Sequence, residues 1–189
     1  MLSDAGRDTE AKAAFDRFIA HQPESAPGYT ARARALMKAK NAASASEDFA
    51  AAISHSSPPD PALFIEHSRA LHATGRVPEA IQTLDAGIAK LGPLIALAQE
   101  AIAIEEAAGH FPEALARIEK VIQSAPRKER WLVRRAALLE KMERPREARV
   151  ALIAARAAIE SLTADRRASA AMTELAAEID AALARIGPR

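Results

Sequence analysis

Apolar and small residues recur along this chain at spacings of three and four, which is the period of a helix that buries one face. The stretch near the C-terminus shows the pattern clearly, with a single stripe formed by Met172, Leu175, Ile179, Leu183 and Ile186. Runs of Val, Thr and aromatic residues that would alternate as strands are absent. The pattern predicts an all-α protein with helices over residues 8–21, 28–40, 45–55, 61–74, 78–91, 94–108, 112–124, 129–142, 146–161 and 165–186.

A longer period is superimposed on the helical one. The stretches GRVPEA and GHFPEA end at Ala80 and Ala114, 34 residues apart, and alanines 11, 45 and 148 hold the same phase. Four residues after each phase alanine stands a large apolar residue, namely Phe15, Phe49, Leu84, Ile118 and Leu152. Three residues further on come Phe18, Ala52, Gly87, Val121 and Ala155. Agreement at several positions predicts a repeated helix pair.

Turn residues separate the predicted helices. A glycine at position 6, 75 or 109 stands five residues before the phase alanine, where its left-handed conformation would end the preceding helix; Lys40 and Glu143 replace it in the other two units. Pro78 and Pro112 suit the first turn of a helix, and Ser44 with Glu47 has the spacing of a capping box. Prolines that would stop the second helix follow in four units, at Pro23, Pro58, Pro93 and Pro126.

This pattern resembles the tetratricopeptide repeat (TPR) family, whose 34-residue helix pair carries W-x₂-L-G-x₂-Y, then A-x₃-F, then P. The A-x₃-[F/L/I] half is present in all five units, over about residues 2–160. The leucine site departs from the motif, because it holds Arg32, His67, Ala101 and Arg135. The resemblance implies an α-solenoid of antiparallel helix pairs, a TPR-like superhelix closed by a C-terminal capping helix.

We therefore expect one TPR-like domain over residues 1–189. Its parts would be a half-repeat over 6–25, repeats over 26–60, 61–94, 95–128 and 129–162, and a capping helix over 165–186 that Thr163 caps. The first unit holds only a second helix, with Leu2 in phase with the end of a missing first helix. Helix 8–21 is thus either an N-terminal cap or the edge of a longer array.

In TPR relatives the first helices line a concave groove that binds partners. Carried over position by position, the resemblance predicts groove residues at Arg34, Lys38, Ile65, Arg69, His72, Gln99, Glu106, Arg130, Val133 and Glu140. A TPR clamp for a terminal carboxylate is not supported, because its asparagine site holds Arg34, Arg69, Ala103 and Ala137. Arginine can still pair with a carboxylate through two hydrogen bonds. The alternative is that these arginines only keep the surface soluble.

Composition narrows the class of function. The 189 residues are 49% hydrophobic and 27% charged, as in globular proteins, and the formal net charge of +1 gives no general attraction to nucleic acid or membranes. The chain has no cysteine, which excludes thiol chemistry. No signal peptide and no apolar run of membrane-spanning length is visible, so we expect a cytoplasmic protein.

No motif indicates catalysis or a cofactor. His67 and His72 are spaced poorly for one helical face, and HExxH, GxSxG and glycine-rich phosphate loops are absent. The basic stretch RKERWLVRR (127–135) holds the only tryptophan. The sequence does not favour nucleic-acid binding there, since nearby glutamates dilute the charge and Trp131 falls next to a core site.

The sequence therefore predicts a non-catalytic protein–protein interaction scaffold, without metal or cofactor, that binds a peptide or protein segment in its groove. The alternative is a TPR regulatory or targeting segment of a larger enzyme or of a secretion or assembly machine. A third hypothesis, an all-helical enzyme, has no supporting group of residues. Oligomeric state is not predicted.

Overall fold

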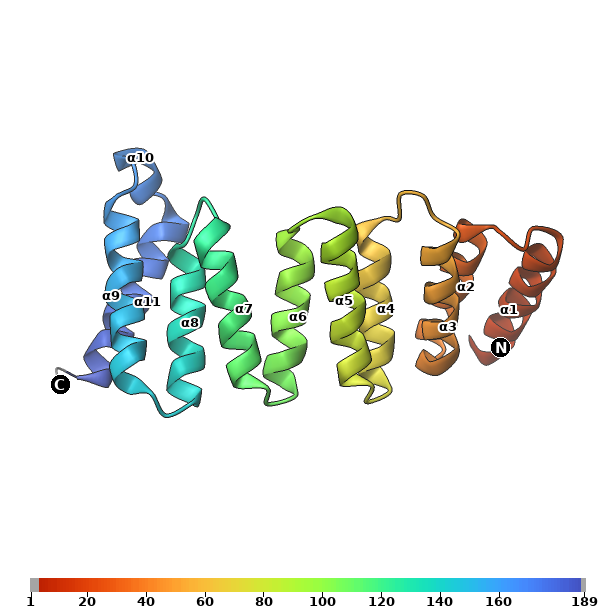
Figure 1. Cartoon of the computed structure of the whole chain (residues 1–189), viewed down its shortest axis with the longest axis horizontal. Helices are drawn as coiled ribbons and strands as arrows, with labels where there is room; N and C mark the ends of the chain where they lie inside the picture. Colours follow the sequence, from red (N-terminus) through yellow and green to blue (C-terminus); the bar gives the residue numbers. More distant parts are fainter. Residues whose placement is uncertain (1–3, 188–189) are drawn as a thin grey trace. The chain divides into compact units, whose positions relative to one another are not determined.

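The computed structural model describes residues 4–187, except for the side chains of residues 4–9 and 11. Over this range the chain is helical and has no strand, which confirms the all-α prediction (Figure 1). The helices are α1 (Asp4–His21), α2 (Ala26–Lys38), α3 (Ala42–Ser54), α4 (Pro61–Ala73), α5 (Val77–Leu91), α6 (Ile95–Ala107), α7 (Phe111–Ser124), α8 (Glu129–Lys141), α9 (Pro145–Glu160), α10 (Ala164–Arg167) and α11 (Ala170–Ile186).

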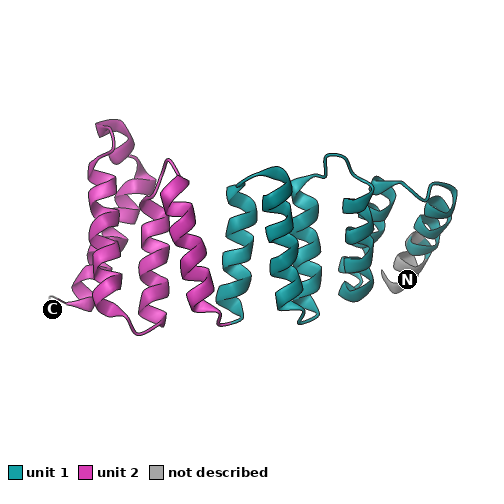
Figure 2. Ribbon diagram, in the orientation of Figure 1, with its two compact units in different colours: residues 1–108 teal, residues 109–189 magenta. Residues whose placement is uncertain are grey.

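The chain divides into two compact units, residues 1–108 and residues 109–189 (Figure 2). In the N-terminal unit each helix from α1 to α6 packs on the next, and α4 also contacts α6. In the C-terminal unit α7 packs on α8, α8 on α9, and α9 on α11, the closing helix. Both units are thus built from antiparallel helix pairs, and the fold is the predicted TPR-like α-solenoid.

The phase positions of the repeat form the core. The alanines at 45, 80, 114 and 148 are fully buried, so neighbouring helices approach to the distance of a methyl group. The large residues four positions later are buried beside them, namely Phe49, Leu84, Ile118 and Leu152. Fully burying such a side chain contributes about 1.5–3 kcal/mol. Ala11 lies outside the described side chains.

Packing between consecutive pairs relies on a small residue that faces a large one. A Cβ atom at Gly87 of α5 would lie 2.9 Å from Cγ of Phe64 and 3.2 Å from Cδ1 of Leu97. At the N-terminal end the sizes are exchanged, because Phe18 is large and Gly28 of α2 makes room for it. At both contacts a glycine therefore makes room for a large side chain of a neighbouring helix.

Left-handed residues follow the ends of four helices, α2, α4, α6 and α8. Gly75 has a φ of 78°, as its phase position predicts, and Gly109 ends α6 in the same way with a φ of 77°. Lys40 and Glu143 adopt this conformation without being glycine, with φ of 58° and 57°. The repeat geometry thus imposes a strained backbone of about 1–2 kcal/mol at these two residues. Gly6 lies inside α1, so the prediction that it ends a helix is wrong.

Two predicted caps differ in the structure. The N-cap of α3 is Asn41, whose side chain accepts a hydrogen bond from the Ser44 amide at 3.3 Å, so the Ser44–Glu47 capping box is wrong. Because the backbone turns at the left-handed Lys40, the next residue, Asn41, stands at the N-cap of α3. Thr163 stands at the N-cap of α10 but makes no side-chain capping bond.

The closing helix is interrupted, whereas the sequence predicted one helix over 165–186. Ser169 is extended with ψ of 143°, and its hydroxyl donates to the carbonyl of Arg166 at 2.7 Å. The Ser169 carbonyl then accepts from Met172 and Thr173, which starts α11. Met172, Leu175 and Ile179 are buried, so the apolar stripe is confirmed. Leu2 lies outside the described residues.

None of the helices in residues 4–187 combines the length and the apolar character that crossing a membrane requires.

Replacing Lys40 by glycine should raise the free energy of unfolding by about 0.5–1 kcal/mol, because the left-handed strain exceeds the entropy cost of glycine. Chemical denaturation measures this change. Lys120→Gly is the matched control in the middle of α7, and it should lower stability by about 1 kcal/mol. An equal loss in both variants would show that Lys40 is unstrained.

Candidate functional site

Two arginines predicted for the groove form ion pairs between successive first helices. Arg34 on α2 donates from Nε and Nη2 to the carboxylate oxygens of Glu66 on α4, at 2.8 and 2.7 Å. Arg69 on α4 makes the same two bonds with Glu100 on α6, at 2.8 and 2.7 Å. The pairs occupy equivalent repeat positions, and we call them the Arg–Glu row. Ala103 holds the next arginine position, so the row ends on α6.

The arginines of the row face solvent, whereas its glutamates lie against the helices. Arg34 and Arg69 are 54% and 60% exposed, and Glu66 and Glu100 are 25% and 16% exposed. The hydrogen bonds to these glutamates raise the pKa of both arginines. Exposed pairs contribute only about 0.2–1 kcal/mol each to stability, so the main effect of this geometry is to hold two guanidinium groups in place.

The other predicted groove residues are partly accessible. Within the N-terminal unit Lys38 and Gln99 are exposed, and the half-buried residues are Ile65, His72 and Glu106. Within the C-terminal unit Arg130 is exposed and Val133 is half-buried. Glu140 of α8 accepts from Nη2 of Arg185 on α11 at 3.0 and 2.8 Å.

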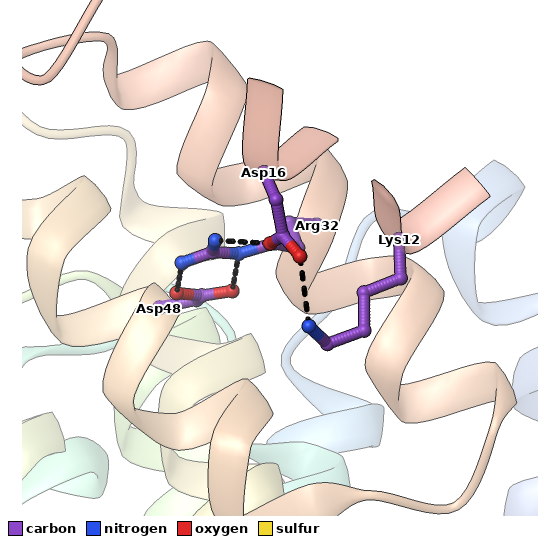
Figure 3. Close-up of polar contacts among 4 residues, drawn as sticks. All are labelled: Lys12, Asp16, Arg32 and Asp48. Carbon is purple, nitrogen blue, oxygen red and sulfur yellow. Dashed lines mark hydrogen bonds and ion pairs between the residues drawn. The ribbon is translucent and has the colours of Figure 1, made fainter. Parts of the chain in front are cut away.

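Arg32 stands at the repeat position where the TPR motif has leucine, and its side chain joins three helices. Its Nε and Nη2 donate to the two carboxylate oxygens of Asp48 on α3, at 2.7 and 2.6 Å. Its Nη1 donates to Asp16 on α1 at 2.7 Å, and Asp16 also accepts from Lys12 at 2.8 Å (Figure 3). A charged network of this kind replaces the apolar contact that leucine makes in the TPR motif.

This network is shielded from water to different degrees at its two ends. The Arg32 side chain is 21% exposed and Asp48 only 8%, whereas Asp16 is 40% exposed. The hydrogen bond to Asp48, followed by that to Asp16, raises the pKa of Arg32. The Lys12 hydrogen bond, aided by Arg32, lowers the pKa of Asp16. Removing Arg32 would therefore leave a buried carboxylate without its cation.

The repeat position of Arg32 holds an arginine again in the C-terminal unit. Arg135 on α8 donates to Glu119 on α7 at 3.2 Å, and Glu119 stands five residues after its phase alanine, as Asp16 does. The partners of these arginines, like Glu66 of the row, were not singled out from the sequence. A search for opposite charges at fixed repeat offsets could have found them.

His67 holds the equivalent position in the repeat that follows the one with Arg32. Burial, followed by the positive charge of Arg76, lowers the pKa of His67, and Glu79 opposes this shift. The imidazole is therefore mostly neutral near pH 7, unlike the guanidinium groups at the same site elsewhere.

Trp131 is part of the packed interior, as expected, with 9% of its surface exposed. The guanidinium of Arg134 lies 6.0 Å from the centre of its ring. A buried indole does not present the open face on which a nucleic-acid base would stack. Within the part of the chain that the structure describes, no three His, Cys, Asp or Glu side chains gather to hold a metal ion.

The arrangement of helix pairs defines a protein of the tetratricopeptide-repeat fold. No protein-family model matches the sequence, and no curated protein matches it. Solved structures do match at the level of the fold. The TPR protein YrrB has 15% identity and a TM-score of 0.61, covering 95% of this chain and 87% of its own.

Two further structures support the same fold. MamA has 16% identity and a TM-score of 0.63, covering 84% of this chain and 92% of its own. The C-terminal part of a TPR repeat-containing protein from Cytophaga hutchinsonii has 17% identity and a TM-score of 0.63, covering 98% of this chain and 76% of its own. Identities this low establish the fold alone.

Arg32→Leu should lower the free energy of unfolding by about 2–4 kcal/mol, because Asp48 stays buried without its cation. Arg32→Leu/Asp48→Ala should recover most of this loss, since both charges are then removed. Urea denaturation of the two single variants and the double variant measures the coupling. The exposed pair offers a comparison, since Arg69→Leu/Glu100→Ala should show a coupling below about 1 kcal/mol. Equal couplings would contradict the difference in burial.

The His67 imidazole should titrate below the ordinary histidine pKa of about 6.5 in an NMR titration. Because the unfolded chain binds this proton more readily, the His67 contribution to stability should fall as pH drops through about 6.5. Arg76→Gln should raise the pKa of His67 part of the way back. Arg144→Gln, in the C-terminal unit, is the control and should leave it unchanged.

Proposed function

We propose that this protein is a non-catalytic scaffold that binds a peptide or protein segment, and that the Arg–Glu row of α2, α4 and α6 contacts that segment. The observation that carries the proposal is the pair of exposed guanidinium groups that glutamates hold at equivalent repeat positions. The TPR fold supports this class of function, and YrrB is described as a TPR protein with an unusual peptide-binding site.

The row has donors left for a ligand. Each arginine uses Nε and Nη2 toward its glutamate, so Nη1 still carries two N–H groups that can donate to a carbonyl or carboxylate oxygen. Because the glutamate already restrains the arginine, a ligand loses less side-chain entropy when it binds. The two built-in carboxylates also cancel the charge of the two arginines, which favours backbone carbonyls over strongly acidic ligands.

The spacing of the row suits an extended segment. Packed helices lie about 8–10 Å apart, and an extended chain rises about 3.3 Å per residue. Successive arginines would therefore meet acceptors about three residues apart along the peptide. Half-buried Met37 and Ile65, on the same helices, would contact its apolar side chains.

Peptides selected from a displayed random library on the intact protein provide ligands for the test. Arg34→Gln/Arg69→Gln should weaken their binding roughly tenfold in calorimetry, because hydrogen bonds from charged donors are lost. Arg144→Gln/Arg156→Gln removes two ion-paired arginines elsewhere and should leave the affinity unchanged. The assignment of the row fails if the first variant binds the same peptides as tightly as the unaltered protein.

A further inference from the structure

The N-terminal unit has an open hollow of about 440 Å³ between α3 and α5. From α4, His67 contributes to its lining; Glu47 and Ala50 line it from α3, and Glu79 and Thr83 from α5. The hollow shares no residue with the Arg–Glu row.

The preceding repeat shows what the same place holds when the chain fills it. There the Arg32 guanidinium lies between Asp16 on α1 and Asp48 on α3, with bonds of 2.6–2.7 Å (Figure 3). A cation from a first helix, bonded to carboxylates on two neighbouring second helices, therefore occupies the groove between those helices.

In the hollow no cation on α4 joins α3 to α5, and the Arg76–Glu79 ion pair there is confined to the start of α5. His67 stands at the repeat position of Arg32, while Ala50 and Thr83 stand at the positions of the two aspartates. Short uncharged side chains thus replace both aspartates. The space that Arg32 and its two aspartates fill in the preceding repeat is therefore open here. The neutral imidazole of His67 offers a ring nitrogen that accepts a hydrogen bond.

Two carboxylates remain on opposite walls of the hollow, Glu47 on α3 and Glu79 on α5. Glu79 accepts from Arg76, and the two side chains are 48% and 47% exposed. An ion pair this exposed contributes little to the free energy of folding, so another cation can readily take the place of Arg76 beside Glu79. With His67 neutral, the charges of Glu47, Glu79 and Arg76 sum to one net negative charge around the hollow.

We propose that this hollow is a second binding site, which takes an arginine side chain of a partner protein. The incoming guanidinium lies between Glu47 and Glu79 and donates to them and to His67, as Arg32 donates to its two aspartates. The aliphatic part of the arginine packs on Ala50 and Leu71. The partner thereby completes, between chains, the arrangement that the preceding repeat completes within the chain.

NMR titration of the intact protein with N-acetyl-argininamide tests the site. The signals of Ala50, His67 and Thr83 should shift and saturate, whereas the neutral isostere N-acetyl-citrullinamide should leave them in place. N-acetyl-glutamate amide tests the opposite preference. Stronger shifts with glutamate, equal shifts with citrulline, or shifts located elsewhere would overturn the proposal.

Variants separate the site from the fold and from the Arg–Glu row. Glu47→Gln/Glu79→Gln should weaken N-acetyl-argininamide binding about threefold to tenfold, since two screened charges are lost. Ala50→Asp restores the acid at the position of Asp16 and should strengthen it about threefold. Unchanged affinity in both variants would contradict the guanidinium assignment.

Steric variants complete the test. Ala50→Leu fills the hollow and should abolish binding, whereas Ala89→Leu, exposed on α5 outside the lining, should bind normally. Amide spectra confirm that each variant is folded. Arg34→Gln/Arg69→Gln should bind N-acetyl-argininamide as the unaltered protein does, so failure of the row and failure of the hollow give different results.

Discussion

The close approach of helix to helix at the phase alanines is the constraint on which the rest of the structure depends. With only a methyl group between backbones, each helix pair has little volume of its own and must bury its faces against its neighbours. The glycines at positions 87 and 28, which make room for large side chains, meet the same requirement. So does the left-handed backbone at Lys40, which the tight turn imposes whatever the residue.

Charged side chains stand at repeat positions other than those of the phase alanines and the large apolar residues. Where the TPR motif has a buried leucine, Arg32 and Arg135 reach carboxylates on second helices. On the first helices, Arg34 and Arg69 reach glutamates of the following repeat. Each contact joins two different helices, either consecutive ones or the first helices of successive repeats, so the polar groups add specificity to an interior of small apolar residues. Because a solenoid repeats its geometry, the same contacts recur wherever the charges recur.

Most of the fold could be predicted because its signals are local and periodic. The 34-residue phase placed the helices, and the buried alanines and large apolar residues confirm it. The errors are at boundaries, as at Ser44 and Ser169, where a neighbouring side chain or one extended residue decides the helix end. The candidate site was predicted less well. Arg34 and Arg69 were placed by register, but their pairing with glutamates requires two helices to meet.

The sequence by itself determined the class of fold, the repeat length and the apolar positions, because periodicity specifies which face of each helix avoids water. Only the tertiary structure decided which charges pair, since Arg32 and Asp48 become partners when α2 packs on α3. Tertiary structure also decided that the place of Arg32 is open one repeat later, at His67. The physical reason is that an ion pair or a hollow belongs to the space between elements, whereas amphipathic periodicity belongs to each helix alone.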